Sequence, residues 1–223
     1  MRKKIIAIAL LGGVLSVIIY FFTQNNDITI VSIGDGISLG MTPYGIEGLS
    51  FNDYLKEDYQ TKHELKTYIH EFASAGKTTK ELIYEIKENK SLVIKNEQIE
   101  IKQAINHADI LTIAIGMDEL AHQKITNQIK NEYLHDIEEL LSMIKMLNQK
   151  KVIVISLYTW GKNDILSIEK LNASLRDITL TNNFIFIDIN KILMPEKYYL
   201  SQDSYYINYL GHKAIYEELK KWL

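Results

Sequence analysis

Residues 28–40 read ITIVSIGDGISLG, a short β-branched run followed by a polar turn that carries three glycines. Three later runs have the same apolar character: residues 110–115 (ILTIAI), 152–157 (VIVISL) and 184–187 (FIFI). Short runs rich in Ile and Val are typical of strands buried on both faces of a parallel sheet. Residues 64–70 alternate loosely between apolar and polar side chains and predict a fifth, weaker strand.

Longer amphipathic stretches lie between these runs and predict helices at residues 50–57, 78–88, 130–149, 165–182 and 210–222. Strands that alternate with helices predict an α/β fold, a three-layer α/β/α sandwich around a mainly parallel sheet. Residues 88–103 carry alternating charge, and we expect a solvated surface loop with a helix start there. The length suits one domain, which we place at residues 27–223.

The composition excludes several classes of function. A formal net charge of -3 and an isoelectric point near 6.1 provide no broad basic field, so nucleic acid is not an expected partner. The absence of cysteine excludes disulfides, thiolate metal sites, a cysteine nucleophile and a lipid-modified N-terminal cysteine. The histidines have no metal-ligand spacing, and the sequence predicts neither a cofactor nor a metal site.

The first 26 residues predict a membrane anchor. Three basic residues at positions 2–4 precede an uncharged run of 18 residues at 5–22, IIAIALLGGVLSVIIYFF. As a helix this run would be about 27 Å long, close to the hydrocarbon thickness of a bilayer. The basic cluster favours a cytoplasmic N-terminus, so the remainder is expected to be extracytoplasmic, on a single-pass protein of the cytoplasmic membrane. A cleaved signal peptide is the alternative, although residues 23–26 (TQNN) lack a small-x-small cleavage pattern.

The polar turns after the strands are where a ligand site is expected, because open parallel sheets bind ligands beyond the carboxyl ends of their strands. After the first run, Gly34-Asp35-Gly36 resembles the Gly-Asp-Ser block of the SGNH (GDSL) hydrolases, with glycine in place of serine. Gly76 lies just before a predicted helix, like the glycine of that family's second block.

Two later turns resemble the remaining blocks. Gly116-Met117-Asp118-Glu119 is similar to Gly-x-Asn-Asp, with Asp118 in place of asparagine and Glu119 in place of aspartate. Asp203 and Tyr206 match Asp-x-x-His, with tyrosine in place of histidine. All four blocks occur in the family's order, which implies an SGNH/flavodoxin-like fold.

The resemblance implies a serine esterase whose chemistry has been lost. In the family, the serine attacks an ester, the histidine removes its proton, and the serine, glycine and asparagine groups stabilise the oxyanion. Gly36 has no side chain, the phenol of Tyr206 is a poor base, and the carboxylate of Asp118 accepts hydrogen bonds but does not donate them. We therefore predict a catalytically degenerate, membrane-anchored protein that binds an envelope glycan, lipid or protein partner.

Other interpretations remain open. An active esterase or deacylase, acting on acyl or acetyl esters of lipid or cell-surface carbohydrate, would need Ser38 or His212 in the crevice, or a water activated by Asp118 or Asp203. The expected role of Ser38 is a helix start, and His212 is expected on the surface or as a cap of the closing helix. A cation bound by the acidic residues of these turns is another alternative. A purely structural anchor for a membrane complex would have a filled crevice.

Tyrosines cluster around the last block, at positions 198, 199, 205, 206 and 209. Such rings can stack on sugars, but packing against the closing helix explains the same cluster without any ligand and is the favoured expectation.

Overall fold

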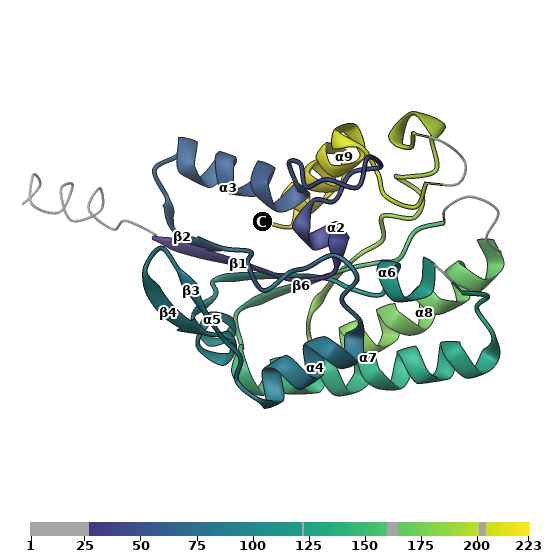
Figure 1. Cartoon of the computed structure of the whole chain (residues 1–223), viewed down its shortest axis with the longest axis horizontal. Coiled ribbons are helices and arrows are strands. Elements are labelled where there is room, and N and C mark those ends of the chain that lie inside the picture. The colour runs from purple at the N-terminus through teal and green to yellow at the C-terminus, as the bar shows by residue number, and fades with distance from the viewer. Residues whose placement is uncertain (1–26, 122, 160–164, 201–203) are drawn as a thin grey trace, which may run out of the picture.

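The computed structural model describes residues 27–223 except 122, 160–164 and 201–203 (Figure 1). The predicted membrane anchor therefore lies outside the described residues, as does Asp203. Among the helices of the described ranges, none has the length and apolar character needed to cross a bilayer.

A five-stranded sheet forms the centre of the fold. Its strands are β1 (Ile28–Gly34), β2 (Leu65–Ile69), β5 (Ile110–Ala114), β6 (Lys151–Ile155) and β7 (Ile185–Ile187), in the spatial order β2-β1-β5-β6-β7. Each of the four pairings is parallel. Every residue of β5 is buried, as the continuous apolar runs predicted. The predicted α/β fold with a mainly parallel sheet is thus confirmed.

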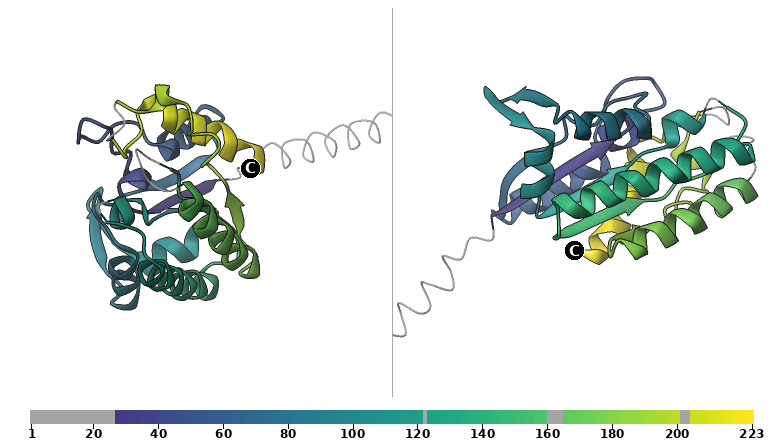
Figure 2. Two further views of the ribbon diagram at one scale, coloured as in Figure 1. Left: turned by 90° about the vertical axis from the view of Figure 1, so that its right-hand side faces the viewer. Right: turned by 90° about the horizontal axis from the view of Figure 1, so that it is seen from below.

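Helices cover both faces of this sheet (Figure 1). One face carries α2 (Gly36–Leu39), α3 (Phe51–Thr61) and α9 (Tyr209–Leu219), and the other carries α4 (Thr79–Lys87), α5 (Ile101–His107), α7 (Asn127–Leu147) and α8 (Ile165–Thr181). Figure 2 shows α7 and α8 side by side along the sheet. A short helix, α6 (Met117–Ala121), follows β5, and the 3-10 turns Glu196–Tyr198 and Lys220–Trp222 flank α9.

The register of β1 and β5 brings the polar turns together. Gly34 pairs with Ala114, so the two strands end side by side. The amide of Asp35 extends this pairing by donating to the carbonyl of Ala114 at 2.9 Å. Residues about 80 positions apart in the chain therefore meet at the carboxyl edge of the sheet, where a ligand site was expected.

The segment at residues 88–103 differs from the prediction of a surface loop. It forms an antiparallel hairpin of β3 (Ser91–Ile94) and β4 (Glu97–Glu100), followed by α5. Lys95 and Asn96 make the two-residue turn, with φ angles of 50° and 69°. Positive φ at both turn positions suits the twist of a hairpin. The loop part of the prediction was wrong because Lys-Asn is a weaker turn signal than Asn-Gly and because charged residues hide the alternation of the strands. The expected helix start is present as α5, which begins at Ile101.

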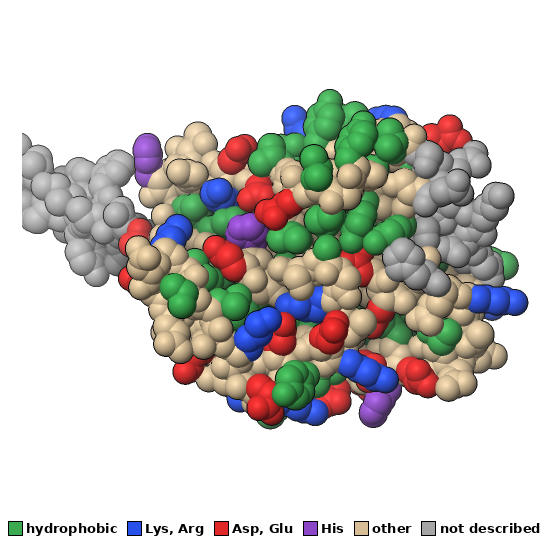
Figure 3. Space-filling view, viewed as in Figure 1, with side chains coloured by type: hydrophobic (Ala, Val, Ile, Leu, Met, Phe, Trp, Pro, Cys, Tyr) green, Lys and Arg blue, Asp and Glu red, His purple; other side chains and the backbone are tan. Residues whose placement is uncertain are grey.

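The surface is divided by residue type. On the face in Figure 3, apolar side chains gather over α9 and the loop before α3, where Tyr44, Ile46 and Tyr209 are exposed. Over α4, in contrast, lysine and acidic side chains alternate.

Candidate functional site

Asp35 is a fully buried acid that fastens the turn after β1 to the turn after β5. Its Oδ1 accepts a hydrogen bond from the amide of Ile37 at 3.0 Å and so caps α2. Its Oδ2 accepts from the amides of Met117 at 2.8 Å and Asp118 at 3.2 Å. Burial and the neighbouring charge of Asp118 raise the pKa of this carboxyl well above its usual range. Asp35 therefore braces backbone and does not face a ligand.

Asp118 accepts hydrogen bonds from two backbone amides that the resemblance assigns to oxyanion stabilisation. Its Oδ2 accepts a hydrogen bond from the amide of Gly36 at 3.0 Å and another from the amide of Gly76 at 2.6 Å. The side chain is buried, and its second oxygen has no hydrogen-bond partner among the described residues. The two amides that the resemblance assigns to oxyanion stabilisation thus already hold a carboxylate of the chain itself.

Tyr206 occupies the space where a nucleophile's side chain would stand. A Cβ atom built on Gly36 would lie 2.5 Å from the phenol oxygen of Tyr206. The ring packs against Tyr205 with a centroid distance of 4.2 Å. Burial raises the pKa of the Tyr206 phenol, and the contacts with Tyr205 and the charge of Asp118 raise it further. The phenol therefore stays protonated at neutral pH and is a poor general base.

The loop that presents Gly76 is held on both sides. The amide of Ser74 donates to the carbonyl of Gly34 at 3.1 Å, which ties the loop to the end of β1. Gly76 has a φ of 79°, in the left-handed region that glycine adopts without strain. Thr78 and Glu81 then form a capping box that starts α4. This is the helix that the sequence predicted to follow the glycine.

Glu119 joins the third block to the second. Its carboxylate accepts from the amide of Thr79 at 3.1 Å and from the hydroxyl of the same residue at 2.5 Å. Burial raises the pKa of Glu119. Asp35, Asp118 and Glu119 thus accept from different backbone amides, and no group of three or more acidic or histidine side chains in the described ranges is placed to hold a metal ion. Asp203, the fourth acidic residue of the cation alternative, lies outside the described residues.

This arrangement of blocks agrees with comparisons to known proteins. The model of the GDSL-like lipase/acylhydrolase family matches residues 30–219. The chain belongs to this family. A search of curated proteins found no match for this GDSL-family chain.

Several solved structures resemble the fold of this chain at low sequence identity. A lipase from a goat rumen metagenome has a TM-score of 0.68 and 18% identity, with 87% of this chain and 96% of that chain covered. An acetylxylan esterase from Geobacillus stearothermophilus has a TM-score of 0.65 and 17% identity, with 89% and 95% covered. An α/β-hydrolase enzyme from the Lake Arreo metagenome has a TM-score of 0.63 and 15% identity, with 87% and 94% covered. At these identities the likeness concerns the fold.

Ser38, the alternative nucleophile, is fully buried in the core of the chain. Its hydroxyl lies 2.9 Å from the carbonyl of Ile33 and 3.1 Å from that of Ala114, and it accepts from the amide of Ala114 at 3.2 Å. These bonds join β1 to β5. The side chain is committed to backbone and does not reach the crevice, and α2 is capped by Asp35 three residues earlier.

His212, the alternative base, is also fully buried, so the prediction of a surface or capping position was wrong. Asn208 caps α9 instead, by accepting from the amides of Leu210 and Gly211. The Nε2 of His212 lies 3.4 Å from the carbonyl of Met41, and Nδ1 has no partner among the described residues. Burial lowers the pKa of His212 to about 4. The spacing of His212 with the buried residues Ile215, Tyr216 and Leu219 was the signal that marks the inner face of the helix.

The tyrosine cluster divides between core and surface. Tyr198, Tyr199, Tyr205 and Tyr206 pack partly buried against the core, as expected, whereas Tyr209 is 61% exposed at the start of α9.

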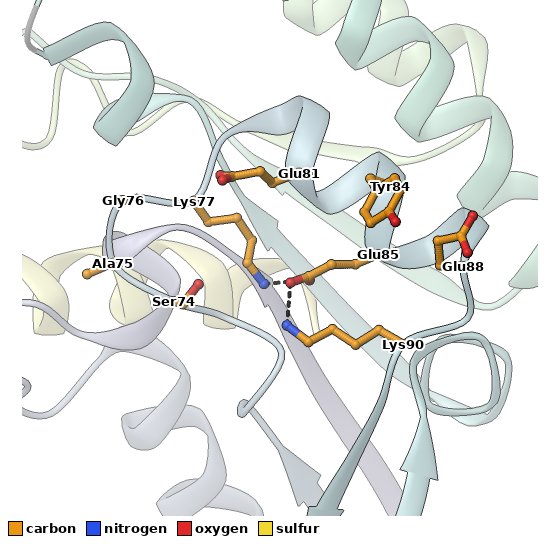
Figure 4. Close-up of a pocket in the computed structure, with 9 residues that line it drawn as sticks. All are labelled: Ser74, Ala75, Gly76, Lys77, Glu81, Tyr84, Glu85, Glu88 and Lys90. Carbon is orange, nitrogen blue, oxygen red and sulfur yellow. Dashed lines mark hydrogen bonds and ion pairs between the residues drawn. The ribbon is translucent and has the colours of Figure 1, made fainter.

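A hollow of about 520 Å³ lies beside Gly76 and was not predicted from the sequence (Figure 4). One wall is the loop 74–77, and the other is α4 with Lys90 beyond it. The helix contributes Glu81, Tyr84 and Glu85, and its C-cap residue Glu88 also lines the hollow. These positions follow the i, i+3, i+4, i+7 spacing of a single helical face, which is the signal that could have revealed this wall.

Proposed function

We propose that this GDSL-family chain is a membrane-anchored, extracytoplasmic protein that does not hydrolyse esters and that binds an envelope component or a partner protein. The observation that carries the loss of hydrolysis is the position of Asp118. One of its carboxylate oxygens receives the amide hydrogens of both Gly36 and Gly76. An ester oxyanion would have to displace this carboxylate and would be repelled by its charge.

Magnitudes from other esterases support a large loss of rate. Removing a single oxyanion donor slows acyl transfer by about 10²–10³-fold, and removing a nucleophile or base alone slows it by about a millionfold. Here Gly36 lacks a nucleophile, Tyr206 replaces a base and Asp118 engages both donors. The position of the reacting atoms is filled, so a ligand would bind beside it.

The acetylxylan esterase supports the assignment of the missing groups. Its catalytic mutants change a serine, an aspartate and a histidine, and the last two lie three positions apart. Asp203 and Tyr206 have the same separation. Tyr206 would then stand where that esterase has its histidine.

The experiment is a measurement of acetate release from p-nitrophenyl acetate by the full-length chain. We expect no turnover above the uncatalysed rate. We also expect little activity from Gly36→Ser with Tyr206→His, because Asp118 still fills the oxyanion site. Adding Asp118→Asn to that pair should raise the rate by about 10²-fold or more. Turnover by the natural chain that disappears in Ser38→Ala would overturn the proposal.

The membrane anchor needs a test of its own. Residues 5–22 are expected to hold the chain in the membrane with residues 27–223 outside the cytoplasm. Fusion of alkaline phosphatase, which is active only outside the cytoplasm, to the C-terminus should give an active reporter in the membrane fraction. An inactive reporter would contradict the orientation, and an active reporter in the soluble fraction would indicate cleavage.

A further inference from the structure

The hollow beside Gly76 has the size of a ligand site. Its volume of about 520 Å³ lies within the range of roughly 300–1,000 Å³ that is usual for small-molecule sites. It adjoins the disabled centre directly, since Gly76 belongs both to its wall and to the amide pair that holds Asp118. A Cβ built on Gly76 would meet no atom within 4 Å, so the space over this residue is open.

Three of the charges that line the hollow are paired with one another. Glu85 lies between two lysines, with Oε2 at 2.6 Å from Nζ of Lys77 and Oε1 at 2.5 Å from Nζ of Lys90 (Figure 4). Glu81 accepts from the amide and the hydroxyl of Thr78. The lining carries three carboxylates and two ammonium groups, so its formal net charge is only -1. Such a lining attracts neither an anion nor a cation strongly, and it suits a ligand without net charge.

The polar groups of the hollow suit many hydroxyls. The ion pairs hold donors and acceptors in fixed places, because Lys77 is 95% buried and also donates to the carbonyl of Phe72 at 2.5 Å. A sugar hydroxyl both donates and accepts, so it can bond to either partner of such a pair. Ser74 on the loop wall and Glu88 at the end of α4 extend the polar lining.

Tyr84 adds an apolar platform at the same place. Its side chain is 66% exposed although it lines the hollow. Tyrosine presents a rigid apolar face with a polar tip, the combination that suits a ring with an apolar face and hydroxyl edges. An exposed ring on one wall, an open glycine on the other wall and an ion-paired group distinguish this hollow from an ordinary solvated helix face.

We propose that this hollow binds a segment of a neutral oligosaccharide, with one sugar ring stacked on Tyr84 and its hydroxyls bonded to the Lys77–Glu85–Lys90 group and to Glu88. This inference deepens the proposed function and rests on it, because it gives the non-hydrolytic chain a ligand class and a place to hold it. The sugar chain would lie beside the former ester site and not in it.

The test is calorimetric titration of the full-length chain with a β-1,4-linked N-acetylglucosamine tetramer and with acetylated xylotetraose. The detergent should carry a zwitterionic headgroup, because sugar detergents would compete for the site. Tyr84→Ala should weaken binding roughly three- to tenfold, while Tyr84→Phe should retain it. Tyr44→Ala removes a similarly exposed tyrosine from the loop before α3 and should leave binding unchanged.

The outcomes separate this inference from the proposed function. Binding of neither oligosaccharide, or equal binding by Tyr84→Ala and the natural chain, would overturn the sugar site. Tighter binding of hexaglutamate or hexalysine than of either sugar would overturn it as well, because an ion site would be indicated. Release of acetate from acetylated xylotetraose by the natural chain would instead refute the loss of hydrolysis, whatever Tyr84→Ala does to the affinity.

Discussion

The packing of Tyr206 over Gly36 predicts a measurable coupling between these two positions. A Cβ on Gly36 would lie 2.5, 2.7 and 2.9 Å from the Oη, Cε1 and Cζ atoms of Tyr206, whereas ordinary contacts are 3.4 Å or longer. Gly36→Ala therefore forces the ring to move by about 0.5–1 Å. Overpacking of this kind typically destabilises a protein by about 1–3 kcal/mol. Because Tyr206 is only partly buried and can shift, we expect about 1–2 kcal/mol.

A double-mutant cycle isolates this energy. Alanine also favours the helical backbone of residue 36 by up to about 1 kcal/mol over glycine, but this gain is the same with and without the tyrosine. Gly36→Ala should thus be destabilising in the natural chain and neutral or stabilising in Tyr206→Ala. The coupling free energy, obtained from urea unfolding of the four full-length proteins followed by far-UV circular dichroism, should be about 1–2 kcal/mol.

The control cycle pairs Gly36→Ala with Tyr84→Ala. Tyr84 lies on α4, and none of its atoms is among the three nearest to a Cβ on Gly36. The two changes should be additive within about 0.5 kcal/mol. A Gly36–Tyr206 coupling as small as that of the control would refute the placement of the phenol in the nucleophile's space.

Three further outcomes are expected from the buried polar groups. The pKa of His212 is about 4 in the folded protein and about 6.5 in the unfolded chain, so the unfolded chain takes up a proton first as the pH falls. The contribution of His212 to the free energy of unfolding should therefore be complete above pH 6.5 and should fall by up to roughly 3 kcal/mol toward pH 4. His212→Gln should lose less stability over that range, and equal losses would contradict this. Lys77→Met should destabilise the protein by about 1–3 kcal/mol, because it breaks a buried ion pair with Glu85. The control Lys62→Met breaks an exposed ion pair with Asp58 and should cost less than about 0.5 kcal/mol. Similar values for the two variants in urea unfolding would contradict the buried role of Lys77. Asp118→Ala should lower the free energy of unfolding by about 2–4 kcal/mol. Millimolar formate should recover part of the lost melting temperature of this variant, because formate can take the place of the carboxylate. No effect of formate would argue against a preformed anion site.

The sheet was predictable because its signals are local. Each of its five strands lies within or next to a run of apolar or alternating residues, and the start of α4 follows from the capping pair Thr78 and Glu81. The hairpin at residues 91–100 was missed because its turn, Lys95-Asn96, carries a weak local signal. The burial of His212 was missed for a different reason. One histidine at a helix start says little, and only its spacing to Ile215 and Leu219 marks the buried face.

The candidate site was predictable in its members but not in its geometry. The sequence showed that Asp118 cannot donate the hydrogen bond that an asparagine would. It did not show that this carboxylate turns toward Gly36 and Gly76, which lie 82 and 42 positions away in the chain. That contact depends on how three loops meet at the end of the sheet, and no local pattern encodes such a meeting. The hollow beside α4 depends on the same placement of the loop 74–77.

Under the proposed function, the hydrogen bonds of Asp118 to the amides of Gly36 and Gly76 would also constrain how esterase activity could arise in this chain. A serine restored at position 36 alone meets the phenol of Tyr206, and a histidine restored at 206 alone finds no nucleophile to activate. Asparagine at 118 alone recovers a donor that no reaction uses. Under the proposed function, no single substitution at these three positions would supply turnover, because each leaves the other two obstacles in place. Ligand binding, in contrast, could change one residue at a time.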